Sequence, residues 1–136
     1  MVMVAAMAPP QVGASPGSGA SGVILAQGVM PEGLEITVAG PNDLVFQQVA
    51  IEGGGHTGWH SHPGTLLVVV KAGTLTRYKA DCTFETYTEG ESFIETEEMH
   101  IGRNEDPFVP AELYVLYLNP VDAPLRSEAE HPDCGL

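Results

Sequence analysis

Apolar and polar residues alternate with a period of two along most of the chain after Val23. Val, Ile, Thr, Tyr and Phe are frequent in the alternating segments, and Gly, Pro, Asn and Asp separate them, which is typical of short strands joined by turns. The predicted strands are Leu34–Val38, Leu44–Ile51, Thr65–Lys71, Thr74–Lys79, Thr83–Thr88, Glu91–Glu95 and Leu113–Leu118. No long segment shows the periodicity of an amphipathic helix. The pattern therefore predicts an all-β domain, either a sandwich or a barrel.

The two ends of the chain differ in composition from its middle. We predict a leader over residues 1–22, a β-barrel over residues 23–120 and an irregular, polar tail over residues 121–136. The apolar start ends in Ala6-Met7-Ala8, which resembles a signal-peptide cleavage site, and Pro9–Gly22 is rich in Pro, Gly, Ser and Ala. We interpret the leader as a signal remnant followed by a flexible linker. A plain disordered terminus is the alternative.

Charge and composition exclude two classes of partner. The chain has 136 residues, 16 of them Gly and 11 Pro, and a formal net charge of −13. So acidic a chain is repelled by phosphate backbones and by anionic lipid headgroups, which argues against nucleic-acid binding. No apolar run reaches the ~20 residues that a membrane-spanning helix needs, so no membrane insertion is expected. A small molecule is the expected ligand.

Three of the five histidines lie in one Gly-rich stretch, GGHTGWHSHPG. In an extended segment the side chains of His60 and His62 point to the same face, so both can reach one metal ion. His100 is the candidate for a third ligand. We place His56 at the mouth of the barrel, behind the ligands, and His131 in the solvated tail.

The spacing of these residues resembles the first of two motifs of the cupins, a superfamily of small jelly-roll barrels. That motif runs Gly, five residues, His-x-His, a Glu a few residues later, and a closing Gly. Gly54, His60 and His62 match its beginning, and Gly73 matches its end. Leu66 stands where the motif has its Glu. We expect Leu66 to line the pocket instead.

The second cupin motif is matched by Gly90, His100 and Asn104, and we place Asn104 beside the pocket. The resemblance implies a single-domain double-stranded β-helix, a jelly-roll barrel of two antiparallel sheets. Such barrels often pair as homodimers, and Val23–Leu25 is a candidate edge strand for that pairing. The motif's Pro-x-Gly turn is absent, and we interpret the acidic run Glu95, Glu97 and Glu98 in its place as a solvated turn.

Without the motif Glu, the resemblance implies a metal site of three histidines. Neutral imidazoles leave a divalent ion its full charge, which favours an anionic chelating substrate, and imidazole suits Fe, Zn, Ni and Cu alike. Three-histidine cupin sites resemble those of non-heme iron dioxygenases, so iron is the first expectation. The alternatives are a non-catalytic binding module for a metal or small ligand, and a zinc- or nickel-dependent lyase or isomerase using a tyrosine or His56 for proton transfer.

The two cysteines, Cys82 and Cys134, lie far apart in the sequence and outside the histidine-bearing segments. A disulfide between them would tie down the tail, and loop-closure entropy assigns such a bridge about 4 kcal/mol. It would place the protein in an oxidising, extracytoplasmic compartment, secreted or periplasmic. Two free thiols in a reduced cytosol are the alternative.

Overall fold

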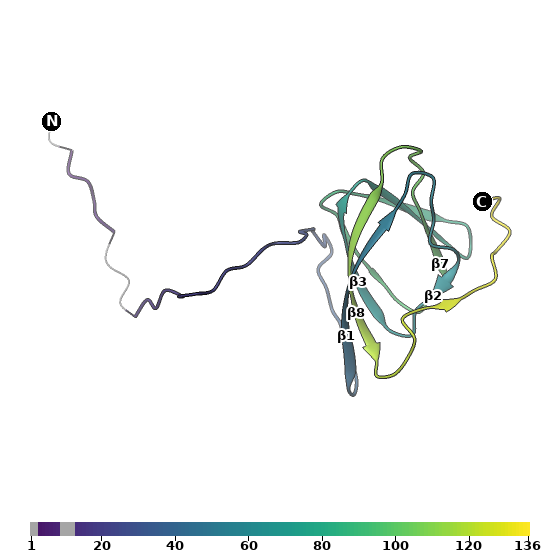
Figure 1. Cartoon of the computed structure of the whole chain (residues 1–136), viewed down its shortest axis with the longest axis horizontal. Coiled ribbons are helices and arrows are strands. Elements are labelled where there is room, and N and C mark those ends of the chain that lie inside the picture. Colours follow the sequence, from purple (N-terminus) through teal and green to yellow (C-terminus); the bar gives the residue numbers. More distant parts are fainter. Residues whose placement is uncertain (1–2, 9–12) are drawn as a thin grey trace.

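The computed structural model describes residues 3–8 and 13–136, which form two β-sheets closed into a barrel (Figure 1). The strands are β1 (Asn42–Ile51), β2 (His60–Ser61), β3 (Thr65–Ala72), β4 (Thr74–Lys79), β5 (Phe84–Thr88), β6 (Ser92–Glu95), β7 (His100–Arg103), β8 (Ala111–Pro120) and β9 (Ser127–Glu128). None of the described residues forms a helix, so none forms an apolar helix long enough to cross a membrane.

The strand order confirms the predicted double-stranded β-helix. One sheet has the order β1-β8-β3-β6 and the other β5-β4-β7-β2-β9, and the paired strands are antiparallel. In the first sheet β3 pairs with β6 and β8, both of which lie well after it in the sequence. In the second sheet a pairing of the same long-range kind places the histidine-bearing strands β2 and β7 side by side.

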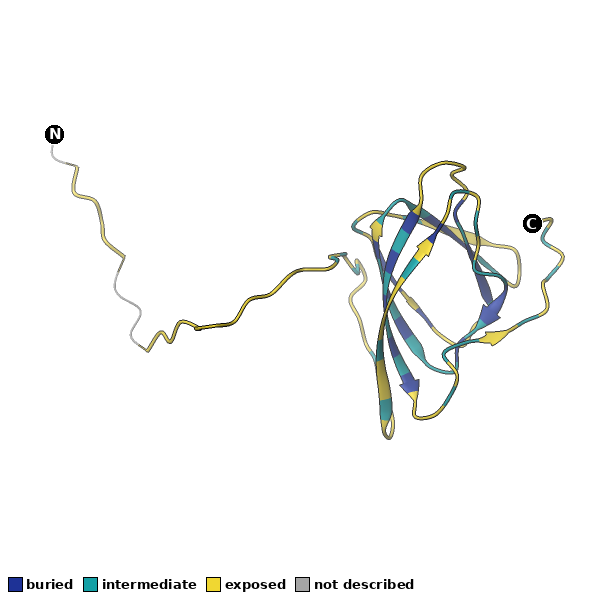
Figure 2. Ribbon diagram, in the orientation of Figure 1, coloured by how far each residue is buried: buried dark blue, intermediate teal, exposed yellow. Residues whose placement is uncertain are grey.

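Alternation along β3 and β8 builds the core between the sheets. Leu66, Val68 and Val70 of β3 are buried, and the side chains between them are more exposed. β8 alternates in the same way, with Leu113 and Val115 buried (Figure 2). Each fully buried Leu or Val stabilises the fold by about 1.5–3 kcal/mol, so these two strands account for much of the hydrophobic stabilisation.

The periodicity located most strands but was wrong at Leu34–Val38, which forms no strand in the structure. Leu34 and Val38 are 47% and 42% exposed, because the segment has no partner strand over which to bury its apolar residues. Val23–Leu25 is also exposed and extended rather than paired. Three short strands were not predicted, namely β2, β7 and β9.

Strand pairing and a disulfide both attach the C-terminal segment to the barrel. β9 pairs with β2, with Glu128 opposite His60, and Cys82 forms a disulfide with Cys134. The predicted disulfide is therefore confirmed. The division into leader, barrel and tail stays a prediction, and its signal-segment part falls partly on residues 1–2 and 9–12, outside the described residues.

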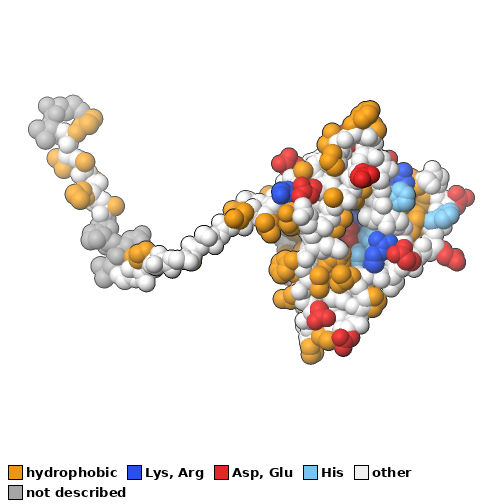
Figure 3. Space-filling view, in the orientation of Figure 1, with side chains coloured by type: hydrophobic (Ala, Val, Ile, Leu, Met, Phe, Trp, Pro, Cys, Tyr) orange, Lys and Arg blue, Asp and Glu red, His pale blue; other side chains and the backbone are white. Residues whose placement is uncertain are grey.

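Apolar side chains gather on the outer face of the four-stranded sheet, on the side from which the N-terminal segment extends (Figure 3). Leu44 and Phe46 of β1 are 62% and 79% exposed there. Ile24 and Leu25 line the same surface hollow as Phe46 and are themselves exposed. This outer face carries no metal-ligand cluster among the described residues, and the site described next lies on the opposite, inner side of the sheets.

Candidate metal centre

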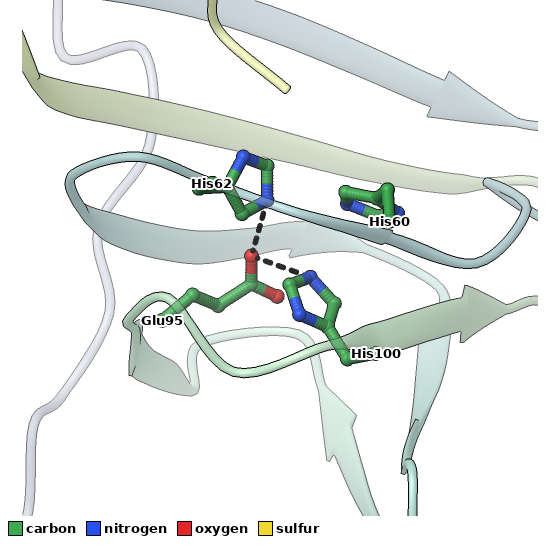
Figure 4. Close-up of side chains that lie close together, drawn as sticks. All are labelled: His60, His62, Glu95 and His100. Carbon is green, nitrogen blue, oxygen red and sulfur yellow. Dashed lines mark ion pairs between the residues drawn. The ribbon is translucent and has the colours of Figure 1, made fainter. Parts of the chain in front are cut away.

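Three strands bring four metal-ligand side chains together inside the barrel (Figure 4). His60 lies on β2, His62 just after it, Glu95 at the end of β6 and His100 at the start of β7. One ligand atom from each residue lies within 4.8 Å of the others, and all four residues are buried. The predicted histidines thus converge, and a carboxylate lies among them.

Strand register explains how the four side chains meet. His60 is directly opposite His100 in the β2–β7 pair, and Glu95 is directly opposite Leu66 in the β3–β6 pair. Cross-strand partners point to the same face of a sheet, so Glu95 enters the barrel beside the position where a cupin carries its motif Glu. The carboxylate is therefore supplied by the neighbouring strand.

The interpretation of Glu95 as part of a solvated turn is wrong, because Glu95 is only 7% exposed. Glu97 and Glu98 of the same acidic run are exposed, as expected. The alternation of faces along a strand could have distinguished Glu95 from the other two. Glu95 lies two residues after Phe93 in the predicted strand Glu91–Glu95 and so points to the same inward face, whereas Glu97 and Glu98 follow the end of that strand.

Each histidine of the cluster is oriented by a backbone carbonyl. The Nδ1 atoms of His60, His62 and His100 lie 2.8 Å from the carbonyl oxygens of Gly58, Leu125 and Glu98, respectively. A carbonyl oxygen only accepts hydrogen bonds, so each Nδ1 must carry the proton and donate it. In the neutral ring this leaves an unprotonated Nε2 lone pair, the form in which imidazole binds a metal.

These lone pairs face a carboxylate, an arrangement that requires a cation. The Nε2 atoms of His62 and His100 lie 3.2 and 3.0 Å from Oε2 of Glu95. Both nitrogens are buried and satisfy no hydrogen-bond geometry. Two acceptors at this distance repel each other unless protons or a metal ion lie between them. The donor set of three imidazoles and one carboxylate fits a divalent transition metal.

Arg77 holds the other side of the carboxylate. Its Nε donates to Oε1 of Glu95 at 3.2 Å, and both side chains are buried. Burial opposes ionisation of Glu95, but the contacts with His100 and His62 and the charge of Arg77 outweigh it and hold the pKa well below its usual range. Burial also lowers the pKa of His60 from 6.5 to about 4. At neutral pH Glu95 is therefore ionised and His60 neutral.

The cluster forms part of the wall of a cavity of about 330 Å³. Its other walls are mainly apolar and include Leu66, as predicted, together with Val49, Val68, Leu75, Leu113, Val115 and Leu125. Tyr117 and Gln47 form a polar patch within it, where the Tyr117 hydroxyl donates to Oε1 of Gln47 at 2.7 Å. Burial, and then the charge of Glu95, raises the pKa of Tyr117, so its hydroxyl stays protonated at neutral pH.

Two predicted pocket residues lie away from this cavity. His56 lines a separate hollow with Trp59 and His131, and its Nδ1 accepts a hydrogen bond from the backbone N–H of Gly58. Asn104 is buried beyond β7, where its amide donates to the backbone carbonyls of Ile51, Glu52 and Val109. Asn104 therefore joins two chain segments and does not line the cavity.

Sequence reasoning missed Leu125 and Arg126, which line the cavity from the C-terminal segment. The segment reaches the site because β9 pairs with β2, and its Leu125 carbonyl accepts the hydrogen bond from His62. Nothing in the local pattern around Arg126 signals this return. A single basic residue in an acidic, Pro-rich segment reads as solvent-exposed.

Comparisons with solved structures support the fold. No protein-family model matches the sequence, and a search of curated proteins finds no match. RemF, a polyketide cyclase from Streptomyces resistomycificus, superposes with a TM-score of 0.56 at 19% identity, covering 69% of this chain and 66% of RemF. An uncharacterised double-stranded β-helix protein from Klebsiella pneumoniae gives 0.54 at 21% identity, covering 68% and 75%.

A third similar structure is the DMSP lyase DddQ from Ruegeria pomeroyi, with a TM-score of 0.56 at 17% identity. The match covers 63% of this chain and 43% of DddQ, so the chain spans less than half of that enzyme. At these low sequence identities, the superpositions show a shared fold alone. The chain has the double-stranded β-helix fold of the cupins.

Proposed function

We propose that this cupin-type barrel is a metal-dependent enzyme that acts on a small organic molecule, with His60, His62, Glu95 and His100 as the metal ligands. One observation carries the proposal: four buried ligand atoms lie within 4.8 Å of one another on the wall of a cavity. The hydrogen bonds from each Nδ1 to a backbone carbonyl support it, because they orient the imidazoles for metal binding before any ion arrives.

The charges around the cluster favour an anionic chelating substrate. A carboxylate ligand lowers the charge of a divalent ion, but Arg77 restores that positive charge through its buried pair with Glu95. A bound metal would supply Lewis-acid or redox chemistry. The apolar walls exclude water from the substrate, and the four protein ligands leave free positions on a six-coordinate ion.

We propose an oxygenase with iron as the metal, and a lyase or cyclase as the second candidate. Tyr117 favours the second candidate, because a protonated hydroxyl inside the cavity can donate a proton to a leaving group. RemF is a cyclase and DddQ a lyase, so the shared fold accommodates such chemistry. A non-catalytic binding module remains the third alternative.

Elemental analysis of protein purified without a His tag tests the proposal. We expect one equivalent of metal in the wild type and in His131→Ala, and none in His60→Ala/His62→Ala. Stoichiometric tight binding by the double variant would refute the ligand assignment. Iron in the wild type would favour the oxygenase, and zinc or nickel would favour the lyase. A metal-free protein that still binds a small ligand would favour the binding module.

Compartment and assembly are proposed on separate observations. The disulfide is consistent with an oxidising, extracytoplasmic compartment, where such bonds persist.

The exposed apolar face that carries Leu44 and Phe46 is the surface on which a homodimer would form. Sedimentation of the wild type and of Phe46→Ser tests the dimer, since replacing an apolar contact at its centre should shift the protein to the monomer.

A further inference from the structure

We propose that Arg126 anchors the anionic group of the substrate, and that the substrate is a small carboxylate with an adjacent oxygen donor and a short apolar chain. This inference rests on the proposed function, because it assigns a substrate class to the same cavity. Among the described residues that line the cavity, Arg126 is the one arginine or lysine. It lies on the C-terminal segment between β8 and β9.

The guanidinium of Arg126 is held next to the metal-ligand cluster. Its Nη2 donates to the backbone carbonyl of Thr57 at 3.0 Å, and the Thr57 hydroxyl oxygen lies 3.5 Å from Nδ1 of His60. Arg126 and His60 therefore both contact Thr57. A single head group that contacts the cluster can also reach the arginine.

The present partner of Arg126 is one that a ligand can replace. Nη2 also donates to Oε2 of Glu128 at 3.0 Å, and Nε lies 2.9 Å from Oε1, but the Glu128 side chain is 77% exposed. Ion pairs this exposed contribute at most about 1 kcal/mol. A substrate carboxylate that displaces Glu128 can use the two donors released on Nε and Nη2, and the donors of Nη1 are free already.

The inner end of the cavity does not repel an anion, because Glu95 is neutralised by Arg77. In a chain with a formal net charge of −13, a divalent ion held by the cluster, together with Arg126, would make this cavity a locally positive region. A planar carboxylate matches the fork of a guanidinium in a bidentate arrangement. These charges favour a carboxylate head group.

The remaining walls define the rest of the ligand. Leu66, Val68, Leu113 and Val115 give the cavity an apolar side, which pairs with a hydrocarbon chain rather than with a second charged group. The volume of about 330 Å³ accommodates a small acid with such a chain. An oxygen next to the carboxylate completes a chelate on the free positions of a six-coordinate metal.

Titration calorimetry with α-ketoisocaproate, which has all three features, tests this inference. The acid is titrated into zinc-loaded and metal-free forms of the wild type, Arg126→Gln, Arg126→Lys and Arg103→Gln. Arg103 is the matched control, because it also pairs with a glutamate, Glu105, but lies outside the cavity. Zinc supports the binding measurement without redox turnover.

We expect Arg126→Gln to bind the acid about 10- to 100-fold more weakly than the wild type, Arg126→Lys to fall between them, and Arg103→Gln to match the wild type. The uncharged methyl ester should bind wild type and Arg126→Gln equally. Pyruvate should bind more weakly than α-ketoisocaproate, because it leaves the apolar walls uncovered. Unchanged zinc affinity in Arg126→Gln would show that the cluster is intact.

Equal affinity of wild type and Arg126→Gln for the acid would overturn the inference, and so would absence of binding to the wild type in both forms. If zinc does not bind, the proposed function fails, and the metal-free titrations alone judge the role of Arg126. If Arg126→Gln does not fold, the comparison of Arg126→Lys with the wild type tests the role of Arg126 instead. A lysine variant that binds the acid and its ester as the wild type does would contradict a bidentate anchor.

Discussion

At Glu95 one buried carboxylate contacts a guanidinium on one side and two imidazoles on the other. Replacing it by Gln leaves the charge of Arg77 buried without a counter-charge. We expect Glu95→Gln to destabilise the metal-free protein by about 3 kcal/mol, the cost of breaking a buried ion pair. Urea unfolding in the presence of a chelator measures this, and the exposed Glu97→Gln is the control. Equal stability of the two variants would contradict the pairing.

His60 predicts how the stability of the metal-free protein depends on pH. Its folded-state pKa of about 4 lies below the unfolded value of 6.5, so between these values the unfolded chain binds the extra proton. Stability must then fall as the pH drops from about 6.5 to about 4, with a contribution of up to about 1.4 kcal/mol per pH unit. His60→Gln should flatten this slope. A slope that is identical in wild type and variant would show that His60 is not the group responsible.

Asn104 connects elements rather than lining the cavity. Its side-chain amide donates to the backbone carbonyls of Ile51, Glu52 and Val109, and its Oδ1 accepts from the N–H of Asp106. Truncation to Ala leaves several buried backbone groups without partners, so we expect a loss of about 3 kcal/mol in urea unfolding.

The control for this prediction is Asn42→Ala. Asn42 donates to two backbone carbonyls as well, those of Ala39 and Gly40, but in an exposed turn. Water replaces these bonds when the side chain is removed, so we expect the stability of this variant to change by less than about 1 kcal/mol. Comparable losses for Asn42→Ala and Asn104→Ala would argue against the joining role of Asn104.

The elements that could be predicted are those whose signal is local. Alternation located β3 and β8, because each is long enough for one buried face to show in the sequence. β2 and β9 have two residues each, too few for any periodicity, and they exist only through pairing with each other and with β7.

The same limit applies to the candidate site. The shared parity of His60 and His62 is local and was readable from the sequence. The position of Glu95 opposite Leu66 depends on the register between β3 and β6, and that of Arg126 on the return of the chain end to the barrel. Both positions depend on contacts between residues far apart in the sequence. The cupin motif has its carboxylate at the position of Leu66, whereas in the structure the carboxylate comes from Glu95 on the neighbouring strand.

Across the whole molecule, the C-terminal segment joins the surface to the interior. Beyond β9 its described attachments are the hydrogen bond from the Ala129 N–H to the Trp59 carbonyl and the Cys82–Cys134 disulfide. On the inner side Leu125 accepts the hydrogen bond that orients His62. A two-residue strand is a weak attachment by itself, and Leu125 is also held by packing against the core and by the hydrogen bond from Arg126 to the Thr57 carbonyl. The disulfide adds a covalent attachment to these contacts.

Removing the disulfide should therefore weaken both stability and metal binding. For the 52-residue separation of Cys82 and Cys134, loop-closure entropy gives a loss of up to about 4 kcal/mol in the Cys82→Ser/Cys134→Ser variant. Loss of the carbonyl partner of His62 should weaken zinc binding by about 10- to 100-fold, as expected when a metal-bound histidine loses its orienting group. Urea unfolding and zinc titration measure the two effects. Adding reductant to the wild type should reproduce them, whereas it should leave the double-serine variant unchanged. If zinc affinity stays constant while stability falls, the disulfide stabilises the barrel without holding the segment that orients His62.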